Sequence, residues 1–136
     1  MQRAINRNPL LLSQVADKAT AADKQVMVDL QDTLRANADR CVGMAANMIG
    51  VNKNIIVVQI GPIPYIMVNP ELISKAHPCR TQEGCLSLDG ERSTKRFKQI
   101  KVRFLDQNLV AHEQVFSDFT AQIVQHEMDH CAGIMI

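Results

Sequence analysis

Residues 125–130 read Gln125-His126-Glu127-Met128-Asp129-His130, and this stretch carries the clearest structural and chemical signal in the chain. It predicts a helix near the end of the sequence. Two histidines four residues apart lie on one face of a helix and can bind one metal ion. Glu127 lies between them, where its carboxylate can accept a proton from a water on the metal. A surface helix that carries two histidines by chance is the alternative, and the full pattern favours a metal site.

Any third protein ligand of such a metal is expected upstream of His126. Six residues follow His130 in this sequence, too few for the distant downstream ligand of thermolysin-like enzymes. The extended metzincin pattern is matched as far as Gly133, but its third histidine would fall at Ile136. The search for a ligand therefore moves back along the chain.

Cys85 is the strongest upstream candidate, in the stretch that runs from Glu83 to Leu88. A cysteine thiolate binds divalent iron or zinc well. His77 is a weaker candidate, because Pro78 and polar neighbours indicate a solvated loop. The cysteines form no C-x-x-C pair, so we expect thiols rather than disulfides.

The order of helical and strand patterns predicts an α+β fold. Residues 20–38 carry an apolar stripe at helical spacing, which predicts a helix in the N-terminal part. Strand-forming runs follow at 54–60, 65–68, 72–73, 100–104 and 109–116. Polar residues 75–80 predict a loop, and basic residues 91–98 an edge strand. We expect antiparallel or mixed β-sheets packed around the C-terminal helix, in a single domain of residues 1–136.

Composition is that of an ordinary globular protein, for which we expect a cytoplasmic location. Hydrophobic residues make up 46% of the chain and charged residues 21%, and the net charge is +1. This balance predicts neither specific nucleic-acid binding nor membrane binding. No apolar run is long enough to span a bilayer, and the N-terminus lacks the pattern of a signal peptide.

Three separated stretches together resemble the peptide deformylase family. In that family a motif G-x-G-Φ-A-A-x-Q, where Φ is apolar, precedes E-G-C-L-S and then Q-H-E-x-D-H. The corresponding stretches here are residues 41–48, 83–87 and 125–130. The resemblance implies a metal-dependent hydrolase that removes the N-formyl group from the N-terminal formylmethionine of newly made peptides and releases formate.

The resemblance also implies roles for individual residues. Cys85, His126 and His130 would hold the metal, with water in the fourth position. Glu127 would take a proton from that water and pass it to the leaving amine. The metal, the backbone N–H of Leu86 and the side chain at position 48 would stabilise the oxyanion.

The remaining implied roles concern the substrate and the support of the metal ligands. Gly43 and Gly84 would offer backbone groups to the peptide. The methionine side chain would enter an apolar pocket near Val42, Phe119 and Ile123. Residues expected to brace the site from behind are Glu83, Arg96, Gln125 and Asp129.

Two departures from the family pattern leave other functions open. The glutamine that closes the first motif is Met48 here, which has no N–H to donate. The first glycine of that motif is Cys41, which could narrow the substrate groove or add a reactive thiol. One alternative is a deformylase-like paralogue with weak or no activity that binds metal and peptide or uses another substrate. Another is a structural zinc site closed by Cys41 or Cys131.

The expected cofactor is a divalent metal ion. The resemblance implies Fe²⁺, although a thiolate and two imidazoles also suit Zn²⁺, Ni²⁺ and Co²⁺. The expected partner is an N-formylmethionyl peptide, and the basic run of residues 92–98 is the feature that could contact a ribosome. We expect a monomer.

Overall fold

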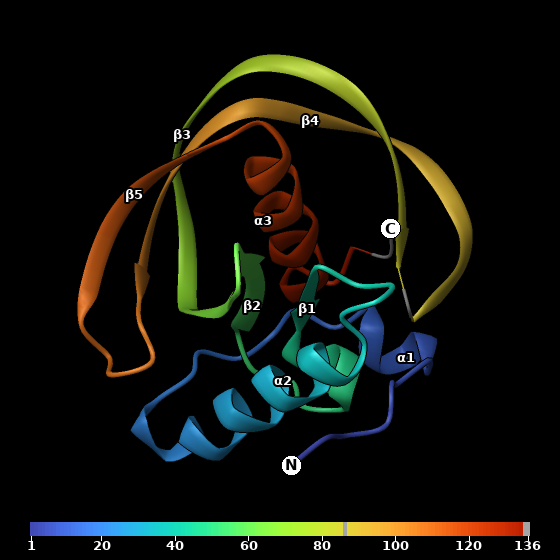
Figure 1. Cartoon of the computed structure of the whole chain (residues 1–136), viewed down its shortest axis with the longest axis vertical. Coiled ribbons are helices and arrows are strands. Elements are labelled where there is room, and N and C mark those ends of the chain that lie inside the picture. Colours follow the sequence, from blue (N-terminus) through green and yellow to red (C-terminus); the bar gives the residue numbers. More distant parts are fainter. Residues whose placement is uncertain (86, 135–136) are drawn as a thin grey trace.

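Helices lie toward both ends of the chain and strands occupy its middle (Figure 1). The computed structural model describes residues 1–85 and 87–134. The helical elements are α1 (Pro9–Leu12), η1 (Ala21–Asp23), α2 (Lys24–Ala36), η2 (Ala46–Ile49) and α3 (Asp118–Cys131), where η marks a 3₁₀ turn. The strands are β1 (Gly43–Ala45), β2 (Ile55–Ile60), β3 (Ile63–Cys85), β4 (Leu88–Leu105) and β5 (Ala111–Ser117).

The strands form an antiparallel sheet in the order β1-β2-β3-β4-β5. Residues 76–85 of β3 and 88–99 of β4 pair with each other and form a two-stranded ribbon. Figure 1 shows this ribbon arching over α3. The predicted α+β fold, with a C-terminal helix against the sheet and a helix in the N-terminal part, is confirmed, and the ladders of the sheet are antiparallel rather than mixed.

The predictions for residues 72–73 and 75–80 were wrong. Neither a separate short strand nor a loop is present, because β3 runs without a break from Ile63 to Cys85. Most of residues 75–80 face a partner on β4, as Lys75 faces Ile100 and Arg80 faces Lys95. Pairing between strands far apart in sequence therefore overrides the weak local strand propensity of this segment. Register shifts between Val68 and Ser74 bend the strand over the helix.

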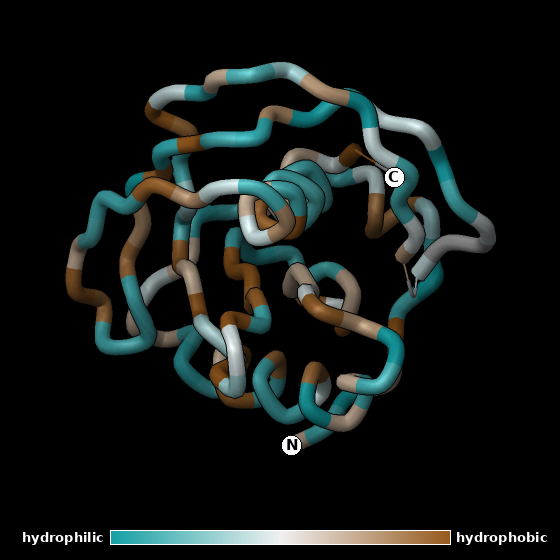
Figure 2. Tube along the Cα trace, turned by 45° about the horizontal axis from the view of Figure 1, so that its top comes forward, coloured by the Kyte–Doolittle hydropathy of each residue, from teal (hydrophilic) through white to brown (hydrophobic). Residues whose placement is uncertain are grey.

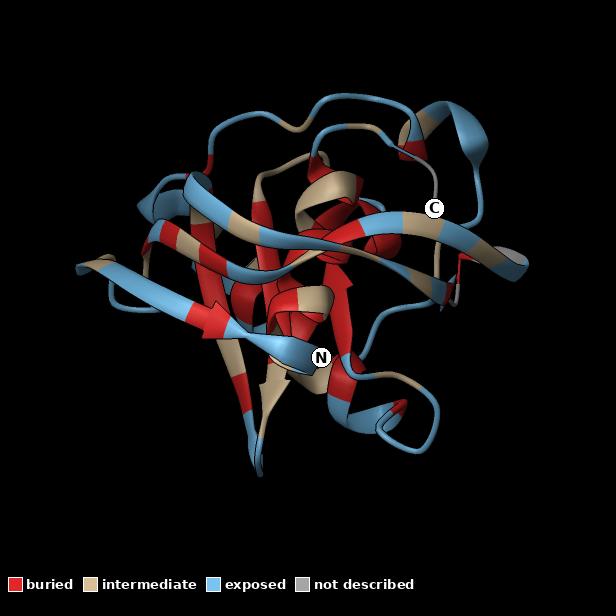
Figure 3. Cartoon of the chain, turned by 90° about the horizontal axis from the view of Figure 1, so that it is seen from above, coloured by how far each residue is buried: buried red, intermediate tan, exposed pale blue. Residues whose placement is uncertain are grey.

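The middle of the sheet is buried on both faces. In β2, Ile55 and Val57 belong to a core that includes α2, whereas Ile56 and Val58 belong to a core that includes α3. This division follows from the two-residue period of a strand. Figure 3 shows the buried residues gathered on α3 and the central strands, and Figure 2 shows hydrophilic colours along much of the ribbon. None of the helices within residues 1–85 and 87–134 has the length and apolar character needed to cross a membrane.

The end of α3 is fixed against the N-terminal segment. The backbone N–H of Ala16 donates to the carbonyl oxygen of Cys131 at 2.8 Å. Gly133, just past the helix, has a φ of 79°, which lies in the left-handed region. A Cβ at this position would lie 2.5 Å from the carbonyl oxygen of Ser13. A glycine is therefore required both by the backbone conformation and by the close approach of the two segments.

Gly133→Ala is expected to lower the free energy of unfolding by about 2 kcal/mol or more, because it adds left-handed strain and a clash with backbone. Equilibrium urea unfolding measures the change. Gly61→Ala is the matched control, since Gly61 has a φ of 57° but no atom within 4 Å of the added Cβ. The strain alone should cost about 1 kcal/mol at Gly61. Equal losses in the two variants would contradict the proposed clash at Gly133.

Candidate metal centre

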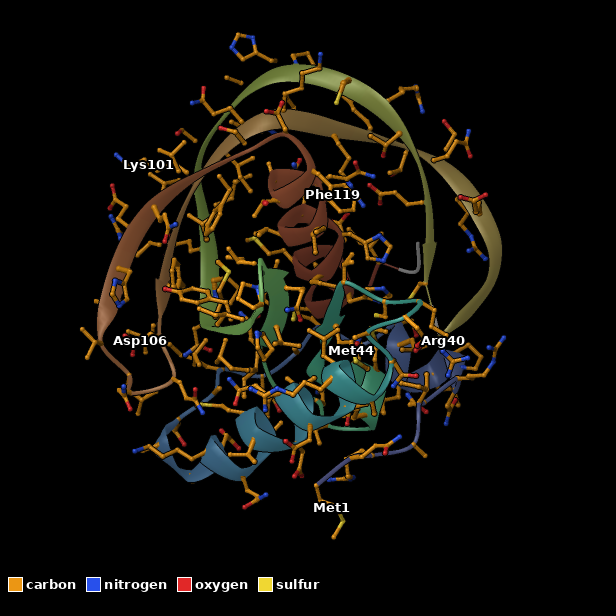
Figure 4. All side chains as sticks on the ribbon, in the orientation of Figure 1. Met1, Arg40, Met44, Lys101, Asp106 and Phe119 are labelled. Carbon is orange, nitrogen blue, oxygen red and sulfur yellow. The ribbon has the colours of Figure 1, made fainter. Side chains whose placement is uncertain are left out.

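Helix α3 presents one face to a cleft of about 700 Å³. The residues of this face follow helical spacing and are Phe119, Gln122, Ile123, His126 and Glu127. The opposite walls come from residues 40–43, at and before β1, and from residues 82–85, at the end of β3. Figure 4 shows Phe119 on α3 beneath the arch of the ribbon, and Arg40 on the segment that follows α2. The cleft therefore gathers segments from both ends of the chain around the histidine pair.

Three potential metal ligands meet beside this cleft, which two of them, Cys85 and His126, line. The Nε2 atoms of His126 and His130 lie 3.2 Å apart, and the Sγ of Cys85 lies 3.3 Å from the Nε2 of His130. All three atoms lie within 4.8 Å of one another. Ligands at about 2.0–2.3 Å from one ion in tetrahedral geometry are separated by about 3.3–3.8 Å, so the arrangement fits a metal ion.

The candidate metal group offers three protein ligands. Within residues 1–85 and 87–134, the group contains Cys85, His126 and His130 and no fourth cysteine, histidine or carboxylate. Cys41 instead donates its thiol hydrogen to the carbonyl oxygen of Gly43 at 2.9 Å. Three protein ligands with an open position are typical of a catalytic site, whereas structural zinc sites have four. The geometry therefore does not support the alternative of a closed zinc site.

A buried chain of charged groups supports His126. Its Nδ1 lies 2.8 Å from the Oε1 of Glu83. Arg96 donates to both oxygens of Glu83 at 2.7–3.2 Å and to Asp129 at 2.6 Å. Burial opposes ionisation of Glu83, but hydrogen bonds from His126, Arg96 and Thr81 bring its pKa down to about 2. Glu83 is therefore a carboxylate that fixes the orientation of the His126 ring.

Burial is the main cause of the pKa shifts of His130 and Glu127. Burial, followed by the charge of His126, lowers the pKa of His130 to about 3, which leaves a neutral imidazole. Burial raises the pKa of Glu127 to about 7. The Oε1 of Glu127 has no hydrogen-bond partner among the described residues. A buried carboxyl group with a pKa near neutrality can both accept and donate a proton.

Gly43 allows β1 to approach α3 closely. A Cβ on this residue would lie 2.7 Å from the Cγ2 of Ile123 and 3.0 Å from the Oε2 of Glu127. Any larger residue would therefore displace one of these side chains. The close approach places the backbone of residues 42–43 beside the carboxyl group of Glu127.

The structure brings most of the predicted site residues together. Val42, Gly43, Met48, Gly84, Phe119 and Ile123 all line the cleft, along with Glu83, Cys85, His126 and Glu127. Leu86 lies outside the described residues. Gln125 anchors α3 rather than a metal ligand, since its side chain bonds the backbone N–H and carbonyl of Phe97. Asp129 acts through Arg96, as the hydrogen bond of that pair shows.

Several residues near the site were not predicted, among them Asn47, Arg40 and Gln122. Asn47 is buried and donates from Nδ2 to the carbonyl oxygen of His130 at 2.9 Å, which fastens η2 to the end of α3. Arg40 and Gln122 line the cleft. The helical spacing of Gln122 relative to His126 was a usable signal in the sequence. The hydrogen bond from Asn47 joins residues 83 positions apart in the sequence, so no local sequence pattern could predict it.

Together, the candidate thiolate–imidazole ligand set and the buried carboxyl group of Glu127 beside the cleft are typical of a metal-dependent hydrolase. Residues 5–136 match the family model for polypeptide deformylase. A peptide deformylase of Clostridium beijerinckii is 51% identical over 136 residues, which is 100% of both chains. The chain belongs to the peptide deformylase family.

Solved structures agree with this assignment. The Met-Ala-Ser-bound class I type b peptide deformylase of Acinetobacter baumannii superposes with a TM-score of 0.88 at 28% identity, covering 99% of this chain and 96% of that one. A peptide deformylase of Legionella pneumophila gives 0.89 at 29% identity, covering 99% and 83%. The protein is thus a metal-dependent amide hydrolase that removes the formyl group from N-formylmethionyl peptides.

Proposed function

We propose that Cys85, His126 and His130 hold the divalent ion of this deformylase, with Fe²⁺ as the native metal, and that Glu127 moves the proton. The 3.2 Å and 3.3 Å separations of the ligand atoms carry this proposal. When bound, the ion would polarise the formyl carbonyl and lower the pKa of water. Zn²⁺, Ni²⁺ and Co²⁺ also suit this ligand set. Metal analysis after anaerobic purification, together with formate release from a formyl-Met-Ala-Ser peptide, tests the assignment.

The side chains of the site perform the proton transfers and hold the substrate. Glu127 accepts a proton from the attacking water and later delivers it to the nitrogen of the leaving amine. Its carboxyl group lies close to residue 43 and would therefore be beside a peptide bound along β1. Gly43 and Gly84 would offer backbone groups to this peptide, and its methionine side chain would lie against Val42, Phe119 and Ile123.

Position 48 contributes no hydrogen-bond donor to the oxyanion. Met48 is buried, and its Sδ accepts a hydrogen bond from the backbone N–H of Ala45 at 3.4 Å. The oxyanion would therefore depend on the metal and on the proposed backbone N–H of Leu86. This proposal predicts an enzyme whose turnover can be raised by restoring an amide at position 48.

Met48→Gln is expected to raise kcat by about tenfold, less than the 100- to 1,000-fold of an ideally placed donor. Glutamine is close to methionine in length, so its oxygen can accept from Ala45 while its N–H faces the cleft. Formate release from the same peptide measures the gain. Met48→Leu is the control, because it removes the sulfur without adding an amide. A kcat that is unchanged by glutamine would show that position 48 does not reach the oxyanion.

The alternative of a weakly active paralogue receives no support from the comparisons. The family match and the relative of 51% identity cover essentially the whole chain. Cys41 is also unlike a reactive thiol, because burial and the charge of Glu127 raise its pKa to about 12. We therefore interpret Cys41 and Met48 as substitutions within a deformylase site rather than as signs of another function.

The proposal also covers the location of the enzyme, its oligomeric state and its contact with the ribosome. We place it in the cytoplasm as a monomer that acts on nascent peptides. Of the basic residues considered for ribosome contact, Arg96 is buried in the ion-pair network with Glu83. Arg92 is half-buried, whereas Lys95 and Lys98 are exposed on the ribbon and are the side chains most accessible for such a contact. Loss of ribosome co-sedimentation in a Lys95→Ala/Lys98→Ala variant at low salt would support this surface.

A further inference from the structure

Gln122 places an amide in the wall of the cleft where an apolar surface was predicted. It lies on α3 between Phe119 and Ile123, is half-buried and lines the cleft. Its side chain makes no hydrogen bond to any residue in 1–85 or 87–134. An amide carries two N–H donors and an acceptor, so this side chain is available to a bound molecule.

The position of Gln122 on the helix assigns it to the substrate side chain rather than to the metal. It precedes His126 by four residues, which is about 6 Å along a helix axis. Long helical side chains point toward the N-terminus, away from the His126–His130 pair. Val42 and Ile123 form the neighbouring apolar part of the same cleft. With this tilt the amide would face the region proposed for the first side chain of the peptide.

We propose that Gln122 hydrogen-bonds a polar tip on the first side chain, so that the enzyme also deformylates peptides that begin with N-formylmethionine sulfoxide. The thioether sulfur of methionine is only a weak acceptor, whereas oxidation adds a strongly polar oxygen. A wholly apolar pocket rejects a ligand with one added polar oxygen by about a hundredfold. The amide of Gln122 offsets this loss by donating to the sulfoxide oxygen. The reaction is unchanged: water cleaves the formyl amide and yields formate and the free amine.

The inference rests on the proposed location of the methionine side chain, and the test uses a ratio that cancels general losses of activity. The values of kcat/KM are measured for formyl-Met-Ala-Ser and for its sulfoxide with metal-loaded enzyme. The wild type should prefer methionine by less than about tenfold. Gln122→Leu should raise this preference by about tenfold or more, because the buried sulfoxide oxygen loses its partner. Gln122→Glu keeps the shape without the donor and should do the same.

Two further variants locate the effect. Gln114→Leu makes the same chemical change on the exposed surface of β5 and should leave the ratio unchanged. Gln82→Leu removes the other glutamine of the cleft, and a change of ratio in this variant alone would overturn the assignment to Gln122. Inhibition by the products Met-Ala-Ser and its sulfoxide should show the same pattern without turnover.

The outcomes separate this inference from the function on which it rests. A Gln122→Leu ratio within about twofold of the wild type overturns the inference. So does a wild type that hydrolyses the methionine peptide but not the sulfoxide. A wild type that hydrolyses neither peptide contradicts the proposed site chemistry as well.

Discussion

Glu127→Ala is expected to keep the bound metal ion and to lose turnover by about 100- to 10,000-fold, the usual contribution of a general acid–base. The carboxyl group belongs to none of the three ligands, whose atoms meet without it. Its Oε1 is buried and has no partner among the described residues, so no structural network depends on that atom. Formate release and elemental analysis of the same preparation measure the two properties.

The variant series separates the proton carrier from general damage to the fold. Glu127→Gln preserves the shape of the side chain and should be nearly as inactive as alanine, because the amide cannot accept and return a proton. Glu71→Ala removes an exposed carboxylate from β3 and should retain full activity. Loss of metal from Glu127→Ala, or turnover equal to the wild type, would rule out the proposed role.

The candidate metal ligands could be predicted from the sequence because short stretches of the chain identify them. Because His126 and His130 are four residues apart, a helix places both side chains on the same face. Cys85 could be predicted as a ligand only from the motif around it, since a single cysteine can have many structural roles. The buried stripe of α2, with Met27, Leu30 and Leu34, likewise follows from helical periodicity.

The errors and omissions arise where distant segments decide the structure. Residues 75–80 look like a loop, yet they form strand because β4 supplies their partners. The bond from Asn47 to the carbonyl of His130 depends on the packing of η2 against α3. Arg96 was expected to pair with Glu83, and the structure adds Asp129 as a second partner. Such networks are fixed by tertiary packing rather than by spacing along the chain.

Arg96 holds the most consequential of these networks. Its side chain is 5% exposed and lies between Glu83, 4% exposed, and Asp129. Arg96→Met should lower the free energy of unfolding by about 3–5 kcal/mol, because it leaves a buried carboxylate without its partner. Metal affinity should also fall by about 10- to 100-fold, since Glu83 would no longer be held against His126. Urea unfolding and titration with a competing chelator measure these losses.

Two controls show whether the lower stability of Arg96→Met comes from a buried carboxylate that has lost its charged partner. Arg103→Met breaks the exposed pair with Glu113, whose side chains are 57% and 38% exposed, and should cost no more than about 1 kcal/mol. The double variant Arg96→Met/Glu83→Gln should recover part of the stability, because no buried carboxylate then lacks a partner. Its metal affinity should stay low, since a neutral amide supports the His126 ring less strongly than a carboxylate. A double variant less stable than Arg96→Met would mean that Arg96 acts through packing alone, and the charged chain would not explain how His126 is held.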